Sequence, residues 1–143
     1  MKTRNVRHTL ALICILLLSS CAPGLKFSEA SNTEDGKVIA EAQTLINKST
    51  EPFSSHTAEV DALKMHIDQV VAAEKKRAKN QQTVNMWTTV QTDRNGLYSY
   101  FDLWKSQGQM SQAMVTEMSK ESQKQLALIQ DWEQRKKGGP LNH

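Results

Sequence analysis

The sequence predicts an all-α fold, a small antiparallel helical bundle made of a long helical hairpin and one shorter N-terminal helix. Apolar residues recur at steps of three and four over most of residues 32–137, which is the periodicity of helices with one buried face. Glycine and proline are scarce between Phe53 and Lys137, where Ala, Gln, Lys, Glu and Met are common. The expected helical domain is therefore 32–137, followed by a disordered tail at 138–143.

The first helix is expected at 32–48. Ser31 and Glu34 have the spacing of a capping box at its start. Its apolar stripe is Val38, Ile39, Ala42, Leu45 and Ile46. Pro52 ends it, because the residue before a proline avoids helical backbone angles.

A long second helix is expected at 54–92. Its apolar stripe weakens in the polar run 74–82 and resumes at Val84, Trp87 and Val90. A break near Asn80 is the alternative to a continuous helix that is exposed on most sides there. The segment 93–96 contains an Asn-Gly pair, which favours a tight turn.

A third helix is expected at 97–137, with a possible kink near Gly108. Its stripe is Leu97, Phe101, Trp104, Met110, Met114, Met118, Leu126, Ile129 and Trp132. Helices two and three match in length across the turn, so they are expected to form the hairpin, with the first helix packed on it as a third member.

Residues 1–20 have the order of a secretory signal: a basic start, a short apolar run and small residues. The apolar run, 10–18, is about half of the roughly 20 residues that a bilayer-spanning helix needs. Leu18-Ser19-Ser20-Cys21 resembles the lipobox of the bacterial lipoprotein signal class. The resemblance covers residues 1–21, and no family resemblance is found in the remainder.

The resemblance implies cleavage between Ser20 and Cys21, with lipid attached to the Cys21 thiol and to the new amino terminus. In enterobacterial members of the class an Asp at the next position retains the protein in the inner membrane. Ala22 therefore implies the outer membrane, with the protein facing the periplasm. Residues 21–31 are then expected to be a flexible tether, because Pro23 and Gly24 break regular structure.

The expected mature chain is electrically balanced. The precursor has 18 Lys and Arg against 15 Asp and Glu, and the signal removes Lys2, Arg4 and Arg7, which leaves 15 of each. This balance predicts no nucleic-acid partner. Cys14 leaves with the signal and Cys21 carries lipid, so no thiol remains for a disulfide or a metal site.

Neither an enzyme nor a cofactor is expected. The sequence has no nucleophile elbow and no glycine-rich phosphate loop. Glu117 and Glu121 are paired carboxylates at i,i+4, but on a helix that looks solvated there. His56, Glu59 and His66 are spread over almost three helical turns, so they are interpreted as surface residues rather than ligands of one ion.

Two groups of residues are candidates for a surface that binds another envelope protein. The aromatic group flanks the expected hairpin turn and could instead fill the core: Trp87, Tyr98, Tyr100 and Trp104. The basic group could touch anionic lipid or an acidic partner, or could be a solvated helix face: Lys75, Lys76, Arg77 and Lys79.

The expected function is that of a membrane-anchored, non-enzymatic interaction protein of the bacterial envelope. One alternative is a periplasmic binder of a small ligand or of Cu(I), through the thioethers of Met110, Met114 and Met118, although methionines at this spacing usually fill core gaps. The other is a structural lipoprotein associated with the cell wall. Its covalent form requires a terminal lysine, which the end Leu141-Asn142-His143 lacks.

Overall fold

The computed structural model describes residues 25–138 and shows a four-helix bundle in which one leg is interrupted. The signal, Cys21 and residues 139–143 of the expected tail lie outside the described residues. Over residues 25–138, five α-helices and two short 3-10 helices follow in the order α2 (Glu29–Lys48), η2 (Phe53–Ser55), α3 (Thr57–Lys75), α4 (Gln81–Thr92), α5 (Leu97–Gln107), α6 (Gln112–Arg135) and η3 (Lys136–Gly138). The prediction of a small all-α bundle is confirmed.

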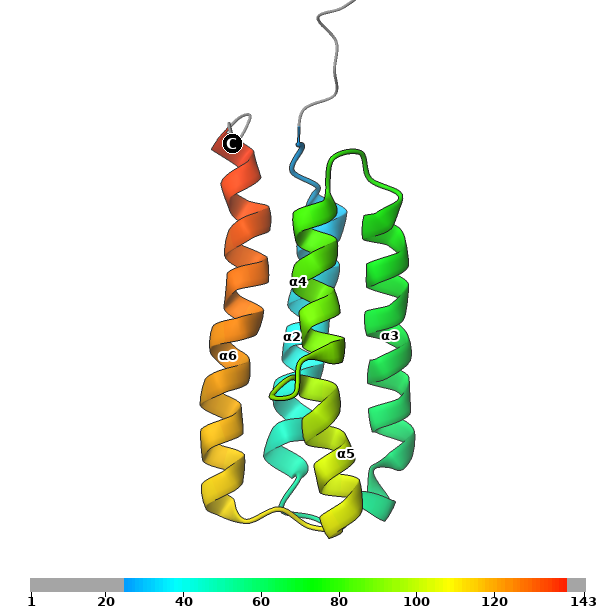
Figure 1. The fold of residues 1–143 in the computed structure, drawn as a ribbon, viewed down its shortest axis with the longest axis vertical. Helices are drawn as coiled ribbons and strands as arrows, with labels where there is room; N and C mark the ends of the chain where they lie inside the picture. The colour runs from blue at the N-terminus through cyan, green and yellow to red at the C-terminus, as the bar shows by residue number, and fades with distance from the viewer. Residues whose placement is uncertain (1–24, 139–143) are drawn as a thin grey trace, which may run out of the picture.

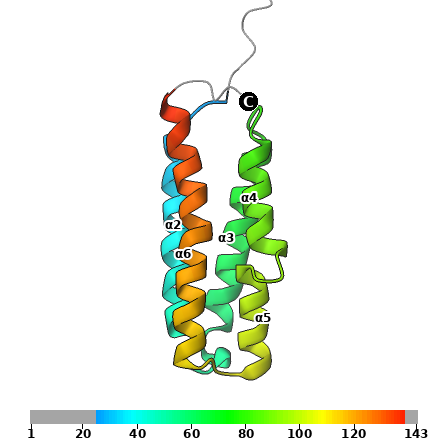
Figure 2. The same cartoon turned by 60° about the vertical axis from the view of Figure 1, so that its left-hand side comes forward.

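Neighbouring legs of the bundle run in opposite directions. Helix α2 runs away from the end that carries both termini of the described chain, α3 returns, α4 and α5 together run away again, and α6 returns (Figure 1). Helix α2 packs against α3 and α6, and α4 packs against the same two helices. Figure 2 shows α2 and α6 side by side along most of their length.

The expected second helix is divided, and the chain reverses there, so the alternative of a break near Asn80 is correct. Helix α3 ends at Lys75 and α4 begins at Gln81. The polar run between them offers no apolar face to bury, and Lys79 adopts a positive φ of 57° that interrupts the helix. The buried side chain of Asn80 donates to Glu74 and closes the turn.

The expected third helix is also divided, and the reversal that was expected at 93–96 lies elsewhere. Helix α5 continues the direction of α4, so 93–96 is an interruption within one leg (Figure 1). The reversal occurs after Gly108, whose φ of 80° favours glycine. This turn is fixed to the α2–α3 connection, because Phe53 N donates to Gly108 O (2.7 Å) and Met110 N donates to Ser49 O (2.8 Å).

The chain before α2 is packed on the bundle over residues 25–28, so the expected tether of 21–31 is too long. Ser28, not Ser31, caps the first helix, and its Oγ accepts from Ser31 N at 3.2 Å. Arg77 donates to the carbonyl of Lys26 at 2.6 Å. These bonds hold the segment before α2 against the start of the α3–α4 turn.

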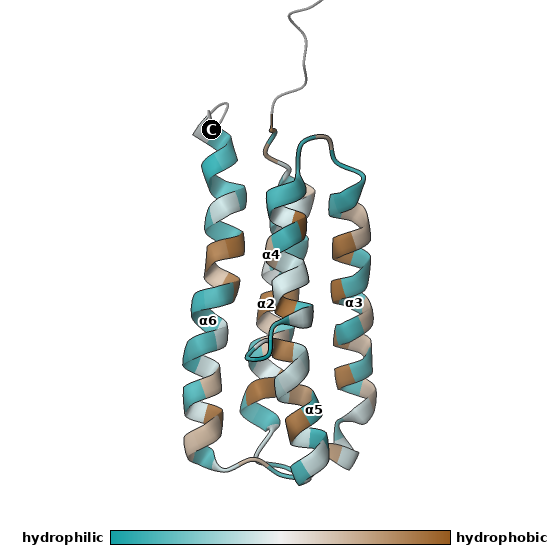
Figure 3. Ribbon diagram, viewed as in Figure 1, coloured by the Kyte–Doolittle hydropathy of each residue, from teal (hydrophilic) through white to brown (hydrophobic). Residues whose placement is uncertain are grey.

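One apolar core fills the space between the four legs. It extends along the chain from Val38 to Ile129, and its largest fully buried side chains include Trp87, Trp104 and Phe101. Figure 3 shows hydrophilic residues at the ends of α3, α4 and α6 nearest the termini. Within residues 25–138 the core extends from Val38 to Ile129, so a chain that starts at residue 21 retains these core residues. No helix within residues 25–138 is both long and apolar enough to cross a membrane.

The interruption at 93–96 depends on the small size of Gly96. A Cβ at this position would lie 2.8 Å from Val90 O and 3.0 Å from Asp93 O, and these backbone atoms cannot move independently. We expect Gly96→Ala to lower the free energy of unfolding by about 2 kcal/mol, as measured by urea unfolding.

Gly36 of α2 provides the matched control. A Cβ there would make only an ordinary contact, at 3.7 Å from Gln130 Nε2. Since alanine favours helix over glycine, Gly36→Ala should raise the free energy of unfolding by up to about 1 kcal/mol. Equal effects of the two substitutions would contradict this account of the interruption.

Candidate functional site

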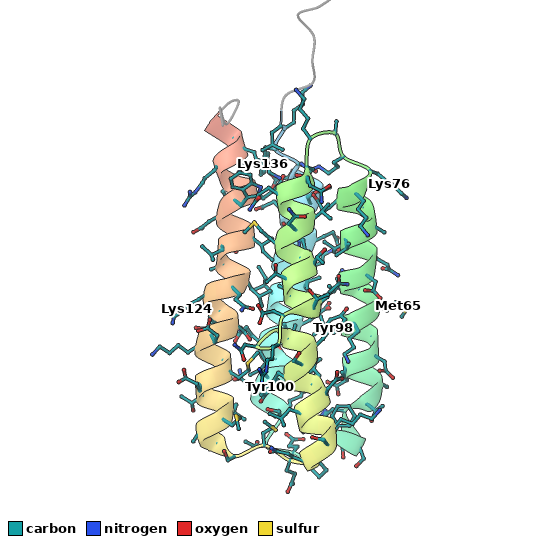
Figure 4. The ribbon with its side chains drawn as sticks, in the orientation of Figure 1. Met65, Lys76, Tyr98, Tyr100, Lys124 and Lys136 are labelled. Atoms are coloured by element: carbon teal, nitrogen blue, oxygen red, sulfur yellow. The ribbon has the colours of Figure 1, made fainter. Side chains whose placement is uncertain are left out.

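Five ionisable side chains are gathered inside the end of the bundle that carries the termini. We call them the buried ionic network: Asp35 of α2, Glu74 of α3, Arg77 of the α3–α4 turn, Glu133 of α6 and Lys136 of η3. Arg77 is half-buried, and the other four are buried. Figure 4 shows Lys136 at this end, in the region between α6 and α4.

Glu133 is the centre of the network. Its Oε1 accepts from Ser28 N and from Arg77 Nη2, both at 2.9 Å, and its Oε2 accepts from Lys136 Nζ. Burial opposes ionisation of this carboxyl, but the hydrogen bonds from Arg77 and Lys136 hold its pKa below the usual value. The Glu133 carboxylate therefore joins the segment before α2, the α3–α4 turn and the end of α6.

Glu74 and Asn80 extend the network across the α3–α4 turn. Glu74 Oε2 accepts from Arg77 Nη1 at 2.7 Å and from the Asn80 side-chain amide. Asn80 Oδ1 accepts from Lys136 Nζ at 2.8 Å, and the same ammonium donates to Thr83 Oγ1 at 2.9 Å. Each of these buried polar groups has a partner, as burial requires.

Asp35 is the least satisfied member. Its Oδ1 accepts from Trp87 Nε1 at 3.2 Å, whereas its Oδ2 has no hydrogen-bond partner among the described residues. Burial, reinforced by the nearby carboxylates of Glu74 and Glu133, raises the pKa of Asp35 to about 7. The network holds three carboxyl groups and two cations. A proton on Asp35 therefore makes the net charge of the network zero.

The network was not predicted, although the sequence contains a signal for it. Asp35 precedes Val38 by three residues, Glu74 follows Val70 by four, and Glu133 follows Ile129 by four. Each acidic residue thus occupies the next inward position of an apolar stripe. The structure places Glu133 inside at this turn of α6, whereas Trp132, which was expected to continue the stripe, is half-buried.

The aromatic group is part of the core, which corrects its prediction as a partner surface. Trp87 and Trp104 are fully buried, Tyr100 is buried, and Tyr98 is half-buried. Trp104 packs edge-on against Phe53 with ring centroids 5.2 Å apart. The physical reason is that α5 continues the α4 leg, which turns its aromatic face inward instead of exposing it at a hairpin tip.

The basic group is divided by the structure. Lys75, Lys76 and Lys79 are exposed at the α3–α4 turn, whereas Arg77 points into the buried ionic network. Figure 4 shows Lys76 at the same end of the molecule as Lys136. Arg77 is therefore engaged within the fold, which corrects its prediction as part of a partner surface.

The three methionines do not share a helix face. Met110 is buried in the turn before α6, Met114 is exposed, and Met118 is half-buried against the core. The prediction of one thioether stripe is therefore wrong, because the reversal after Gly108 removes Met110 from the helix. Within residues 25–138, no cluster of three or more His, Cys, Asp or Glu could hold a metal ion.

His56 and His66 are engaged with carboxylates instead. His66 Nδ1 lies 2.9 Å from Glu41 Oε2 and His66 Nε2 lies 3.1 Å from Glu34 Oε2, and the contact with Glu41 raises the pKa of His66. His56 is buried and lies 3.3 Å from Glu59, so it is not the surface residue that was expected. The two histidines bridge helices and connections within the bundle.

A groove between α5 and α6 opens on the half of the bundle that contains α5. It has a volume of about 410 Å³. Two of the few large apolar side chains that are exposed, Leu103 (37%) and Met114 (40%), line it. Other residues that line the groove are Tyr100, Met118, Arg94, Glu117 and Glu121. The predicted carboxylate pair thus lies at the rim of this groove.

The titration of Asp35 predicts how stability depends on pH. The folded chain retains the Asp35 proton to about pH 7, whereas the unfolded chain releases it near the ordinary pKa of 3.8. The free energy that protonation of Asp35 contributes to the folded state is therefore fully present below the pKa of Asp35 in the unfolded chain. It is lost as the pH rises through the pKa of Asp35 in the folded chain. Asp35→Asn does not titrate, and its side-chain oxygen can still accept from Trp87.

We expect urea unfolding of the Asp35→Asn variant to show a weaker decline of stability between about pH 5 and pH 8 than the parent protein. At about pH 8 the variant should be more stable by roughly 2 kcal/mol. Asp61→Asn, an exposed change on α3, is the control. A parent protein whose stability does not fall over this range would contradict a protonated Asp35.

Comparison with known proteins does not assign the chain to a family. No family model, no curated protein and no solved structure matches the chain.

Proposed function

We propose that this protein is a lipid-anchored, non-enzymatic interaction protein of the bacterial envelope, held at the membrane through Cys21. The observation that carries the proposal is the lipobox-like sequence Leu18-Ser19-Ser20-Cys21 immediately before a chain that folds as one bundle. The outer membrane is the proposed location, because Ala22 follows the cysteine. The partner is another envelope protein.

The packing of the N-terminal segment supports attachment at one particular end. Only Ala22, Pro23 and Gly24 separate Cys21 from Leu25, so the backbone spans at most about 14 Å between these two residues. From Lys26 onward the segment is bonded to the bundle through Arg77 and Glu133. A lipid on Cys21 would therefore keep the end that holds the buried ionic network next to the membrane.

The groove between α5 and α6 is the proposed partner surface. Helix α5 lies in the half of the bundle that is remote from the termini (Figure 1). Leu103 and Met114 expose apolar area there, and Arg94 and Glu117 add charges of both signs at the rim. An apolar centre with a charged rim is the usual composition of a protein interface.

Replacement of Cys21 tests the anchor. In the native host, Cys21→Ser should abolish incorporation of radiolabelled fatty acid, because the thiol that accepts the lipid is gone. The unaltered protein should carry the label and sediment with membranes. Cys14→Ser is the matched control and should be labelled as the unaltered protein is. Absence of label on the unaltered protein would refute the lipid anchor.

Site-specific crosslinking tests the partner surface. A photoreactive amino acid at position 114, inside the groove, should form a discrete crosslinked product in intact cells. The same amino acid at position 65 is the control, because Met65 is also exposed (58%) but lies on α3. Leu103→Glu should abolish the product from position 114, since a carboxylate in the groove opposes apolar contact. Equal products from both positions would contradict a partner site in the groove.

A further inference from the structure

The end of the bundle that carries the termini has a pronounced positive surface charge. We call it the lysine end; its exposed cations within residues 25–32, 72–84 and 131–138 are Lys26, Lys75, Lys76, Lys79, Arg135 and Lys137. Two exposed carboxylates, Glu29 and Asp131, lie in the same ranges. Formal charges thus give a local net of +4, in a mature chain that is expected to be neutral as a whole.

The opposite end of the bundle has no such excess. Between residues 46–59 and 102–112 the charged side chains that reach solvent are Lys48, Lys105, Glu51, Glu59 and Asp102. The positive charge is therefore concentrated at one end. The asymmetry was not evident from the sequence, because the cations come from three separate segments.

The buried ionic network does not cancel this charge. Its carboxylates Glu74 and Glu133 are bonded to Arg77 and Lys136 inside the bundle. Lys75, Lys76 and Lys79 form no ion pair with any described residue. These three ammonium groups are therefore free to meet an external anionic surface.

We propose that the lysine end docks on the anionic phospholipid headgroups of a bilayer, so that the bundle stands upright on the membrane. The inference deepens the proposed function, because Cys21 would bring this same end within about 14 Å of the bilayer. The positive charge of the lysine end and the position of the N-terminal segment thus both indicate an anionic bilayer surface as the binding partner of this end. Upright docking directs α5 and the α5–α6 groove away from the lipid (Figure 1).

Vesicle binding without the lipid tests the charge directly. The probe is the Cys21→Ser chain from residue 21 onward, which retains the core residues from Val38 to Ile129. It should sediment with vesicles of phosphatidylglycerol at low salt and not with vesicles of phosphatidylcholine. Binding should weaken as salt is added, because salt screens charges that are separated by more than a Debye length.

The end variant Lys75→Gln, Lys76→Gln and Lys79→Asn should bind phosphatidylglycerol vesicles roughly a hundredfold more weakly, since each lysine near an anionic surface contributes about fivefold. Asn is chosen at position 79 because it tolerates the positive φ of Lys79. The control variant, Lys105→Gln, Lys120→Gln and Lys124→Gln, loses the same charge elsewhere and should bind as the parent does. Figure 4 shows Lys124 far from Lys76. Circular dichroism verifies that both variants are folded.

Fluorescence quenching in the native lipidated protein measures the orientation of the bundle on the bilayer. With Cys14 removed and Cys21 lipidated, Ala78→Cys supplies one free thiol at the lysine end, and Gln109→Cys supplies one at the opposite end. In phosphatidylglycerol vesicles a fluorophore at position 78 should be quenched by a spin-labelled headgroup, whereas one at position 109 should not. The end variant should show weaker quenching at position 78, because the lipid still keeps this end near the bilayer but the lysines no longer hold it against the headgroups.

Each outcome distinguishes this inference from the lipid anchor. If the unlipidated chain binds phosphatidylglycerol but no fatty acid is found on the native protein, the anchor fails and the docking surface stands. If the native protein carries lipid but the end variant and the control bind alike, the anchor stands and the docking surface is refuted. Failure of the parent chain to bind phosphatidylglycerol at low salt also refutes it.

Discussion

The ionised carboxyl of Glu133 is the contact on which one whole end of this bundle depends. It is fully buried, and it accepts from the backbone before α2, from the guanidinium of the α3–α4 turn and from the ammonium of Lys136. A buried charge is tolerated only when its partners replace the lost water. Two of the three partners, Ser28 and Arg77, come from segments distant in the chain, so the carboxylate also specifies how those segments meet the end of α6. At the opposite end, Trp104 and its apolar neighbours have the corresponding role.

The two ends of the bundle differ in charge and in exposed apolar area. Charge is concentrated at the end where the N-terminal segment is bonded down, both inside, as the buried ionic network, and outside, as the lysine end. Exposed apolar area that borders a groove lies toward the other end, between α5 and α6. A lipid at Cys21 would place the charged end against headgroups and leave the groove accessible. Helix α6, with its 24 residues, gives the bundle a length of about 36 Å.

The local pattern predicted much of this architecture but placed the reversals wrongly. Apolar spacing identified most of the inward positions, and Val38, Trp87, Phe101 and Ile129 are all buried, whereas Met114 of the expected stripe is exposed. The Asn-Gly pair indicated an interruption, yet the same local conformation can either reverse a chain or offset two consecutive helices. Packing against α3 and α6 decides between these outcomes, and it keeps α4 and α5 in one leg. The turn at 76–80 is stabilised by a local contact between Glu74 and Asn80 and by Lys136, which is 56 residues from Asn80 in the sequence.

The sequence by itself determined the fold class, the inward faces of the helices before α6 and the lipobox-like segment, because these depend on the order of residues within short windows. The tertiary structure alone decided that the aromatic group is core, that Arg77 is withdrawn from the basic group and that Asp35, Glu74 and Glu133 meet. It also decided that lysines from separate segments share one end. These properties depend on which helix ends become neighbours, and that choice arises from the summed packing of all four legs.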